Sequence, residues 1–232
     1  MRVLAGLLCI VTQAVTVKAN VEKTIFLGPG PVTLPNVHPS LEDLHLHVLS
    51  HTQTILPTQL PVQFPSTAAP HGLESWYLLQ LEAGRRYEVR ICWPATQPTD
   101  FWLDTYTIDQ TFDAPALISS LAEYSERIQE SDTKIARPHE LADPTAAQSL
   151  LFLRIQAAAS YYSTNRTLMV HPEPVDVDII LDPFLLNVFP QSLGPFAIYF
   201  TAVAIGAWFL SGYIYRWLLS IAAEPAPKPH TD

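Results

Sequence analysis

The sequence predicts a mainly β protein: a lumenal antiparallel β-sandwich with one short helix, followed by a single C-terminal transmembrane helix. Between residues 20 and 192, apolar residues mostly recur at every second position, in short runs bounded by Gly or Pro. One stretch there follows a helical period instead. A long uncharged apolar run lies near the C-terminal end.

Composition narrows the class of protein. The 232 residues are 48% hydrophobic and 15% charged, against about 25% charged in ordinary soluble domains. The formal net charge of −9 is spread along the chain, which argues against a nucleic-acid partner because phosphates require a basic patch. Two cysteines are too few for a disulfide scaffold or a Cys-rich metal site.

Residues 1–19 are expected to be a signal peptide. Arg2 precedes an apolar run over residues 3–15, and Val17 and Ala19 occupy the −3 and −1 positions of a cleavage site. An uncleaved N-terminal anchor is the alternative. Cleavage leaves Cys92 as the single cysteine, either as a buried thiol or as half of an intermolecular bond.

The C-terminal apolar run is long enough to cross a bilayer. Residues 195–215 contain no charge, and 21 helical residues cover the roughly 30 Å hydrocarbon core. We assign residues 193–221 to the transmembrane helix and its flank, and 222–232 to a cytosolic tail. Acidic residues precede the span and Arg216 follows it, so the positive-inside rule predicts a type I protein with residues 20–192 in the lumen. A buried globular helix is the alternative.

The sequon at Asn165 falls on the predicted lumenal side. Asn165 is followed by Arg166 and Thr167, which makes it an acceptor for N-glycosylation. The tripeptide is common by chance, but its position agrees with the topology.

The alternating runs predict the strands. We expect them at residues 24–27, 44–48, 76–81, 86–93, 101–108, 150–156 and 175–181, with a loop over 57–70. A helical stripe predicts the helix over 115–130, with Pro115 in its first turn and its apolar face formed by Leu117, Leu121, Tyr124 and Ile128.

Residues 76–93 are expected to form a β-hairpin around a turn at Ala83 and Gly84. Alternation divides its second strand into two faces. The buried face is predicted to carry Tyr87, Val89, Ile91 and Trp93, and the exposed face Glu88, Arg90 and Cys92.

Two groups of side chains invite a metal-binding interpretation. The first is the histidine cluster His38, His45, His47 and His51, in which His45 and His47 are predicted to share one strand face. The second is Asp176 and Asp178, which resemble the DxD motif of some glycosyltransferases. Neither has a full ligand set, so a solvated strand face is the simpler interpretation of both. We expect no metal site and no cofactor.

Catalytic motifs are scarce. The sequence contains no phosphate-binding loop, dinucleotide fingerprint, serine nucleophile elbow or HExxH motif. The catalytic residues are therefore expected to be none.

Two membrane-associated features point to a partner. In the span, Ala202 and Gly206, and likewise Ala207 and Ser211, have the small-xxx-small spacing that lets helices pack closely, although small residues are common in such helices. We take Ala202, Gly206 and Ser211 as the partner-helix contact. The apolar segment 181–190 lies just before the span. It rests in the membrane interface, contacts a partner or packs back on the sandwich, through the candidate contact residues Pro183, Phe184, Asn187 and Pro190.

Residues 74–104 and 181–195, together with the signal–lumenal–span layout, resemble the fungal co-activator subunit of GPI mannosyltransferase II. The PIG-X type subunit of GPI mannosyltransferase I shares the layout and is the second choice. The resemblance implies a non-catalytic protein of the endoplasmic-reticulum membrane that binds a multi-span mannosyltransferase adding the second mannose. The membrane lipid is the other expected contact.

Other classes of protein fit the layout too. A lumenal hydrolase would need a catalytic pair that the sequence does not contain. A cargo receptor or adhesion protein would share the sandwich and the span, but the tail shows no obvious sorting signal.

Overall fold

The computed structural model describes residues 20–32, 41–131 and 149–222. The predicted signal peptide, His38 and residues 223–232 of the predicted tail lie outside the described residues. Two compact units make up the chain, Met1–Val188 and Phe189–Asp232. We call the first unit the β domain.

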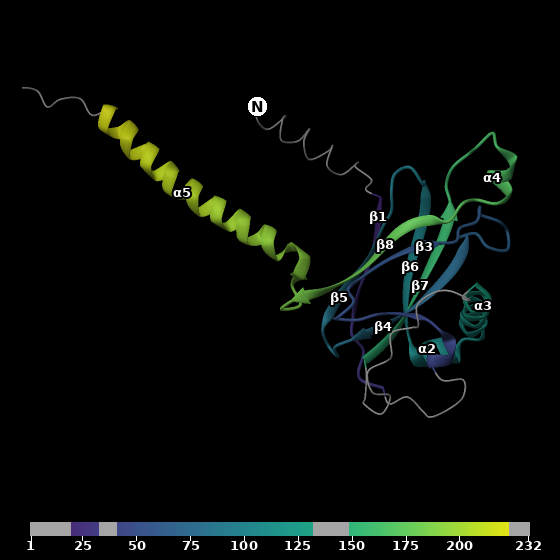
Figure 1. The fold of residues 1–232 in the computed structure, drawn as a ribbon. Helices are drawn as coiled ribbons and strands as arrows, with labels where there is room; N and C mark the ends of the chain where they lie inside the picture. The colour runs from purple at the N-terminus through teal and green to yellow at the C-terminus, as the bar shows by residue number, and fades with distance from the viewer. Residues whose placement is uncertain (1–19, 33–40, 132–148, 223–232) are drawn as a thin grey trace, which may run out of the picture. The chain divides into compact units, whose positions relative to one another are not determined.

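The β domain contains eight strands and three α-helices in its described part (Figure 1). The strands are β1 (Val21–Leu27), β2 (His47–Leu49), β3 (Ile55–Leu60), β4 (Leu73–Leu81), β5 (Arg86–Cys92), β6 (Thr99–Thr107), β7 (Ser149–Ala159) and β8 (Val175–Leu185). The helices are α2 (Ile108–Asp113), α3 (Pro115–Ser131) and α4 (Arg166–Val170), with a 3-10 helix at Leu41–Leu44. The second unit holds the short β9 (Phe189–Pro190), a 3-10 helix at Gln191–Leu193 and α5 (Gly194–Ala222).

Two sheets form the predicted sandwich, which confirms the mainly β fold class. Sheet 1 has the strand order β1-β5-β8-β3, and sheet 2 the order β2-β4-β7-β6. Neighbouring strands in these two orders pair antiparallel except β2 and β4, which run parallel, so the sandwich is not purely antiparallel. The core between the sheets includes the fully buried Leu79, Val89, Ile91, Leu153 and Ile179.

A helical layer lies on the outer face of sheet 2. There Trp76, Leu78 and Phe152 pack with Leu121 and Tyr124 of α3. Both faces of β4 and β7 are therefore buried. This explains why the sequences of these two strands are nearly continuous apolar runs instead of alternating apolar and polar residues. The predicted stripe of α3 is confirmed, and the helix begins at Pro115, where a missing N–H costs nothing.

The expected hairpin of residues 76–93 is wrong. β4 belongs to sheet 2 and β5 to sheet 1, so the turn at Ala83 and Gly84 carries the chain from one sheet to the other. Gly84 has φ +74°, as the turn requires. Local alternation cannot tell this crossover from a hairpin, because both join two strands through a short turn.

The faces of β5 are partly as expected. Tyr87, Val89 and Ile91 are buried, whereas Trp93 lies just beyond the strand, half-buried against Phe101.

Glu88 is not exposed, contrary to our expectation. It is only 3% exposed, and its carboxylate pairs with Lys23 at 3.1 Å and Arg90 at 3.6 Å on the outer face of sheet 1. Arg90 also lies 3.5 Å from Asp182, another buried carboxylate.

Other strand boundaries differ for local reasons. β3 occupies part of the predicted loop, since an edge strand tolerates Pro57. The predicted strand 44–48 begins only at His47, because His45 has φ +52°. β6 ends at Thr107, whose side chain and that of Gln110 form a capping box for α2. The helix α2 and the short α4 accompany α3, so the prediction of one short helix was incomplete.

Candidate functional site

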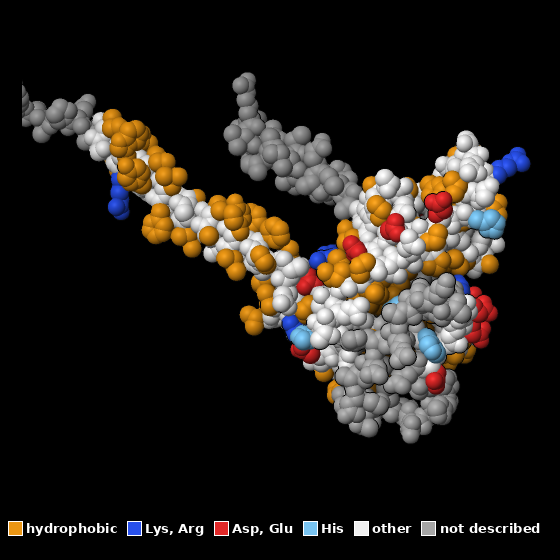
Figure 2. All heavy atoms as spheres, in the orientation of Figure 1, with side chains coloured by type: hydrophobic (Ala, Val, Ile, Leu, Met, Phe, Trp, Pro, Cys, Tyr) orange, Lys and Arg blue, Asp and Glu red, His pale blue; other side chains and the backbone are white. Residues whose placement is uncertain are grey.

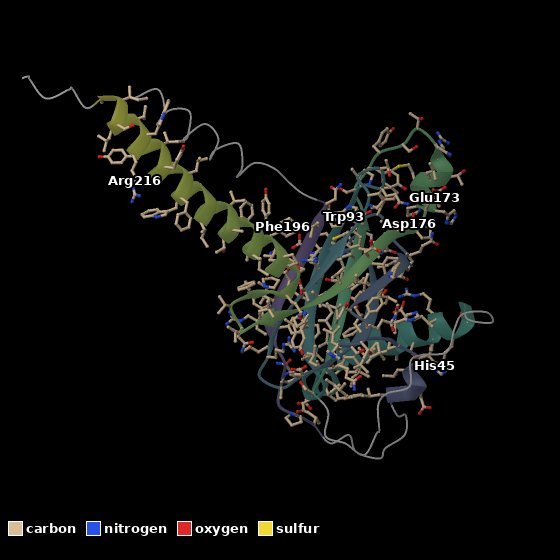
Figure 3. The ribbon with its side chains drawn as sticks, turned by 60° about the vertical axis from the view of Figure 1, so that its left-hand side comes forward. His45, Trp93, Glu173, Asp176, Phe196 and Arg216 are labelled. Carbon is tan, nitrogen blue, oxygen red and sulfur yellow. The ribbon has the colours of Figure 1, made fainter. Side chains whose placement is uncertain are left out.

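α5 is a long apolar helix. It is 29 residues long, about 43 Å at the usual rise, which exceeds the hydrocarbon core of a bilayer. Its side chains are exposed throughout, and Figure 2 shows hydrophobic side chains along its whole length. Phe196 and Arg216 lie toward its two ends (Figure 3). Among the described residues it is the one helix with the length and composition to cross a membrane.

The small residues of α5 form two faces rather than one. A helix turns about 100° per residue, so Ala202 and Gly206 lie on one side. Ala207 and Ser211 lie on the other, with Ser211 roughly 180° from Ala202. A shallow groove of about 390 Å³ follows the second face, between Leu210 and Tyr215. A helix can approach closely on either side.

The contact residues that the sequence analysis named just before α5 are partly occupied by internal contacts. β8 continues to Leu185, so the segment 181–185 packs back on the sandwich. Phe184 is buried, with the Arg86 guanidinium 5.9 Å from its ring centre, and Pro183 is half-buried. Pro190, in the second unit, is also half-buried.

Asn187 holds the chain just after β8. Its Oδ1 accepts a hydrogen bond from the Arg86 backbone N–H at 2.8 Å, and its Nδ2 donates to the Gly84 carbonyl at 3.1 Å. Its neighbours Leu186 and Val188 are 94% and 70% exposed. The sequence analysis named Asn187 as a contact residue but did not predict these two hydrogen bonds. The one indication in the sequence was that Asn tolerates a left-handed turn conformation.

Asp176 and Asp178 lie on the solvent side of β8, as alternation predicts. Asp176 accepts a hydrogen bond from Gln59 Nε2 at 2.8 Å. Both carboxylates line an open hollow of about 590 Å³ together with Cys92 and Trp93. Trp93 and Asp176 are labelled in Figure 3. Burial raises the pKa of the Cys92 thiol, Arg90 opposes that effect and Asp178 adds to it, so the thiol is less reactive than a free one.

The histidines do not form the strand pair that we expected. His45 precedes β2 in a left-handed conformation, and its Nδ1 lies 2.7 Å from the Asp43 carbonyl. His47 is in β2, beside Tyr77, and His51 is exposed. Within residues 20–32, 41–131 and 149–222, no three potential ligands from His, Cys, Asp or Glu come together as a metal site.

A polar network that the sequence did not indicate lies beside α3. Arg154 donates to Asp104 and to Tyr106, both at 2.7 Å, and contacts Glu74 at 3.4 Å. Burial lowers the pKa of Arg154, but the Asp104 hydrogen bond and the nearby Tyr106 and Glu74 outweigh it, so the net shift is upward. Ser120 of α3 donates to Glu74. The Arg154 contacts join β4, β6 and β7 within sheet 2, and the Ser120 bond ties α3 to that sheet, so the network has a structural role.

Asn165 is exposed at the N-terminus of α4. Its Oδ1 accepts a hydrogen bond from the Thr167 backbone N–H at 3.0 Å and caps the helix. α4 lies near the beginning of β8, at the end of the β domain away from the Asn187 turn (Figure 1).

The chain matches one family model over residues 63–212, more than half of its length. That model is Pga1, the GPI-mannosyltransferase II co-activator. The chain belongs to the Pga1 family. No curated protein and no solved structure matches it.

The Pga1 match covers β4 to β8, the Asn187 turn and the first two thirds of α5. The resemblance stated from the sequence is therefore confirmed, and the family is that of mannosyltransferase II, the first of our two expectations. Co-activation of GPI mannosyltransferase II is the function of this family. The family thus places the chain in GPI-anchor biosynthesis, in association with a mannosyltransferase.

Proposed function

We propose that this protein is a non-catalytic subunit that binds a multi-span mannosyltransferase in the endoplasmic-reticulum membrane and supports addition of the second mannose to the GPI precursor. The Pga1 match carries the proposal. The enzyme would supply the catalytic residues and the cavity for lipid-linked substrates, because one span is too little to enclose them.

The proposed topology is type I, with the β domain in the lumen and Asn165 glycosylated. It is supported by charge. Glu173, Asp176, Asp178 and Asp182 precede α5, and Arg216 lies near its C-terminal end, as the positive-inside rule expects for a cytosolic C-terminus.

The proposed enzyme contact uses the small residues of α5 and the membrane-proximal residues Pro183, Phe184, Asn187 and Pro190. Interhelical packing in lipid depends on close approach, since apolar burial offers no advantage over lipid tails. The Ala202 and Gly206 face and the Ser211 face would each accept one enzyme helix.

Three helix variants test the contact separately. Gly206→Leu and Ser211→Leu each add bulk to one small-residue face, and both are expected to reduce co-purification with the enzyme in mild detergent. Gly212→Leu is the matched control, because it adds a leucine on a third side, roughly 100–120° from the other two. Equal co-purification of all three variants would contradict docking through these faces.

The precursor that accumulates tests the function. Depletion of the protein is expected to accumulate a GPI precursor with one mannose. Normal intermediates would reject the co-activator role in this cell, and a precursor without mannose would favour action with mannosyltransferase I.

A double variant tests the non-catalytic role. Asp176→Ala combined with Asp178→Ala is expected to preserve mannose addition, because both carboxylates lie on a solvated strand face. Loss of mannose addition in a stable, enzyme-bound double variant would instead assign catalysis to these residues.

A further inference from the structure

The turn that follows β8 has a conformation that its residues do not favour. Leu186 and Asn187 have φ of +52° and +58°, and the Val188 N–H donates to the Leu185 carbonyl at 3.0 Å. Two central residues with positive φ are typical of a type I′ turn, for which Asn-Gly is preferred. Asn187 suits such a position, but a leucine with positive φ is strained.

Within the part of the β domain that the structure describes, Leu186 gains almost no burial that would offset this strain. Its side chain is 94% exposed, and the side chain of Val188 is 70% exposed. An asparagine or glycine at position 186 would fit the turn better. The fold of the β domain therefore does not explain why a leucine occupies position 186.

Contacts within the β domain hold the turn with the exposed side chains of Leu186 and Val188 in place. Asn187 binds the turn between β4 and β5 through Gly84 and the Arg86 backbone, and its own carbonyl accepts from the Arg86 guanidinium at 3.1 Å. These contacts fix the two apolar side chains on an outward-facing tip.

Arg86 supplies an exposed cation beside the tip. Arg85 is paired with Glu82 at 3.0 Å. Arg86 is exposed, and its guanidinium contacts the Asn187 carbonyl and the Phe184 ring. The tip thus combines two apolar side chains with a guanidinium, a group that binds phosphate well.

Chain connectivity puts the tip within reach of the bilayer. Val188 and Gly194, the first residue of α5, are six residues apart, which limits their separation to roughly 20 Å. Other exposed apolar residues, such as Tyr162 and Val170, lie near the beginning of β8. That strand of 11 residues separates them from the tip by about 33 Å.

We propose that Leu186 and Val188 insert into the interfacial region of the bilayer, with Arg86 at the lipid phosphates. The inserted tip is a second membrane contact beside α5 and sets how far the β domain stands from the membrane. The proposal rests on α5 crossing the membrane, as in the proposed function.

Nitroxide labels measure the depth of the tip. The full chain, with Cys9→Ala and Cys92→Ala, carries a label at Leu186→Cys, Val188→Cys or, as the control, Tyr162→Cys. Each is placed in nanodiscs of phosphatidylcholine. We expect the labels at 186 and 188 to be accessible to oxygen and protected from a water-soluble nickel complex, and the label at 162 to be accessible to nickel.

Two results would overturn the proposal. Equal nickel accessibility at 186 and 162 would mean that the tip is in water. Protection of 186 from both reagents would mean that a protein surface covers it. Neither result depends on the mannosyltransferase, whose binding is measured separately by co-purification.

A second variant separates the membrane role from folding. Leu186→Asn is expected to keep or raise the midpoint of thermal unfolding, because asparagine suits the turn, while the label at 188 becomes accessible to nickel. Tyr162→Asn is the matched control and is expected to leave the label at 188 protected. A label at 188 that stays protected in Leu186→Asn would show that the leucine does not hold the tip in the membrane.

Discussion

At the scale of single residues, the buried ion pairs of sheet 1 distinguish this β domain. Glu88 and Asp182 are nearly inaccessible, and both lie next to Arg90. Burial of a carboxylate is costly unless cations and hydrogen bonds compensate for the lost hydration. The outer face of this sheet therefore depends on charge complementarity as well as on apolar packing.

Removing the Glu88 carboxylate is expected to destabilise the β domain. Glu88→Ala leaves Arg90 and Lys23 without their shared partner and should cost about 1–3 kcal/mol, a value discounted because Lys23 remains largely hydrated. Thermal unfolding of the full chain in detergent measures the effect. Glu123→Ala, on the exposed side of α3, is the control, and equal midpoints for both variants would contradict the role of the pair.

The buried tyrosines make a prediction for high pH. Burial raises the pKa of Tyr77 well above its ordinary value of 10.0, and the neighbouring Tyr124 adds to the shift. Above pH 10 the unfolded chain loses this proton while the folded chain keeps it, so stability is complete below pH 10 and falls as the pH rises. Tyr77→Phe should flatten this fall in unfolding midpoints between pH 9 and about 11, whereas Tyr162→Phe, at an exposed site, should not. An unchanged slope in Tyr77→Phe would show that other groups cause it.

At the scale of elements, α4 is short and has no buried residue, so its capping residue is open to modification. Asn165 begins this helix and is exposed. Its place near the start of β8 separates it from the turn that leads to α5. The sequon therefore lies at the end of the β domain where β8 begins, opposite the end where β8 leads into the Asn187 turn.

We expect Asn165 to carry a glycan in the cell. Endoglycosidase treatment should increase the gel mobility of the protein, and Asn165→Gln should abolish that change. Thr167→Ser keeps the sequon and should preserve the shift, which controls for disturbance of α4. A cytosolic signal from a reporter fused at residue 165 would overturn the proposed topology.

At the scale of the whole molecule, the two units have separate structural requirements. Both hydrophobic clusters of the β domain are formed by residues before Phe189. The side chains of α5 are exposed to their surroundings throughout. Folding of the β domain therefore does not need the particular sequence of α5, whereas recognition of a membrane partner would.

Exchanging the membrane helix tests this division. Replacement of residues 194–222 by an unrelated apolar span of the same length is expected to leave the protein in the membrane with an unchanged unfolding midpoint of the β domain. Co-purification with the mannosyltransferase should be lost, because the small-residue faces are gone. Undiminished co-purification would place the enzyme contact on the β domain instead.

The sequence by itself determined the features that depend on near neighbours in the chain. The structure confirms the stripe of α3 with Pro115 at its start and the length of α5. It also confirms the burial of Tyr87, Val89 and Ile91 in β5 and the solvated face of Asp176 and Asp178 in β8. Each follows from the repeat of a helix or strand, which is set within a few residues. The family resemblance also rested on local stretches, and it identified the co-activator family correctly.

Only the tertiary structure decided which strands pair and what that pairing buries. β4 and β5 adjoin in sequence but belong to different sheets, because β7 and β8 supply their partners from more than 60 residues away. The pairing of β5 with β8 brings Asp182 beside Glu88, and the pairing of β5 with β1 brings Lys23 there, so that Glu88 is buried. The β5–β8 pairing also lets Asn187 reach Gly84 and hold the turn with the exposed Leu186. These contacts depend on register between distant strands, which the alternation of one strand leaves open because every register of the same parity presents the same face.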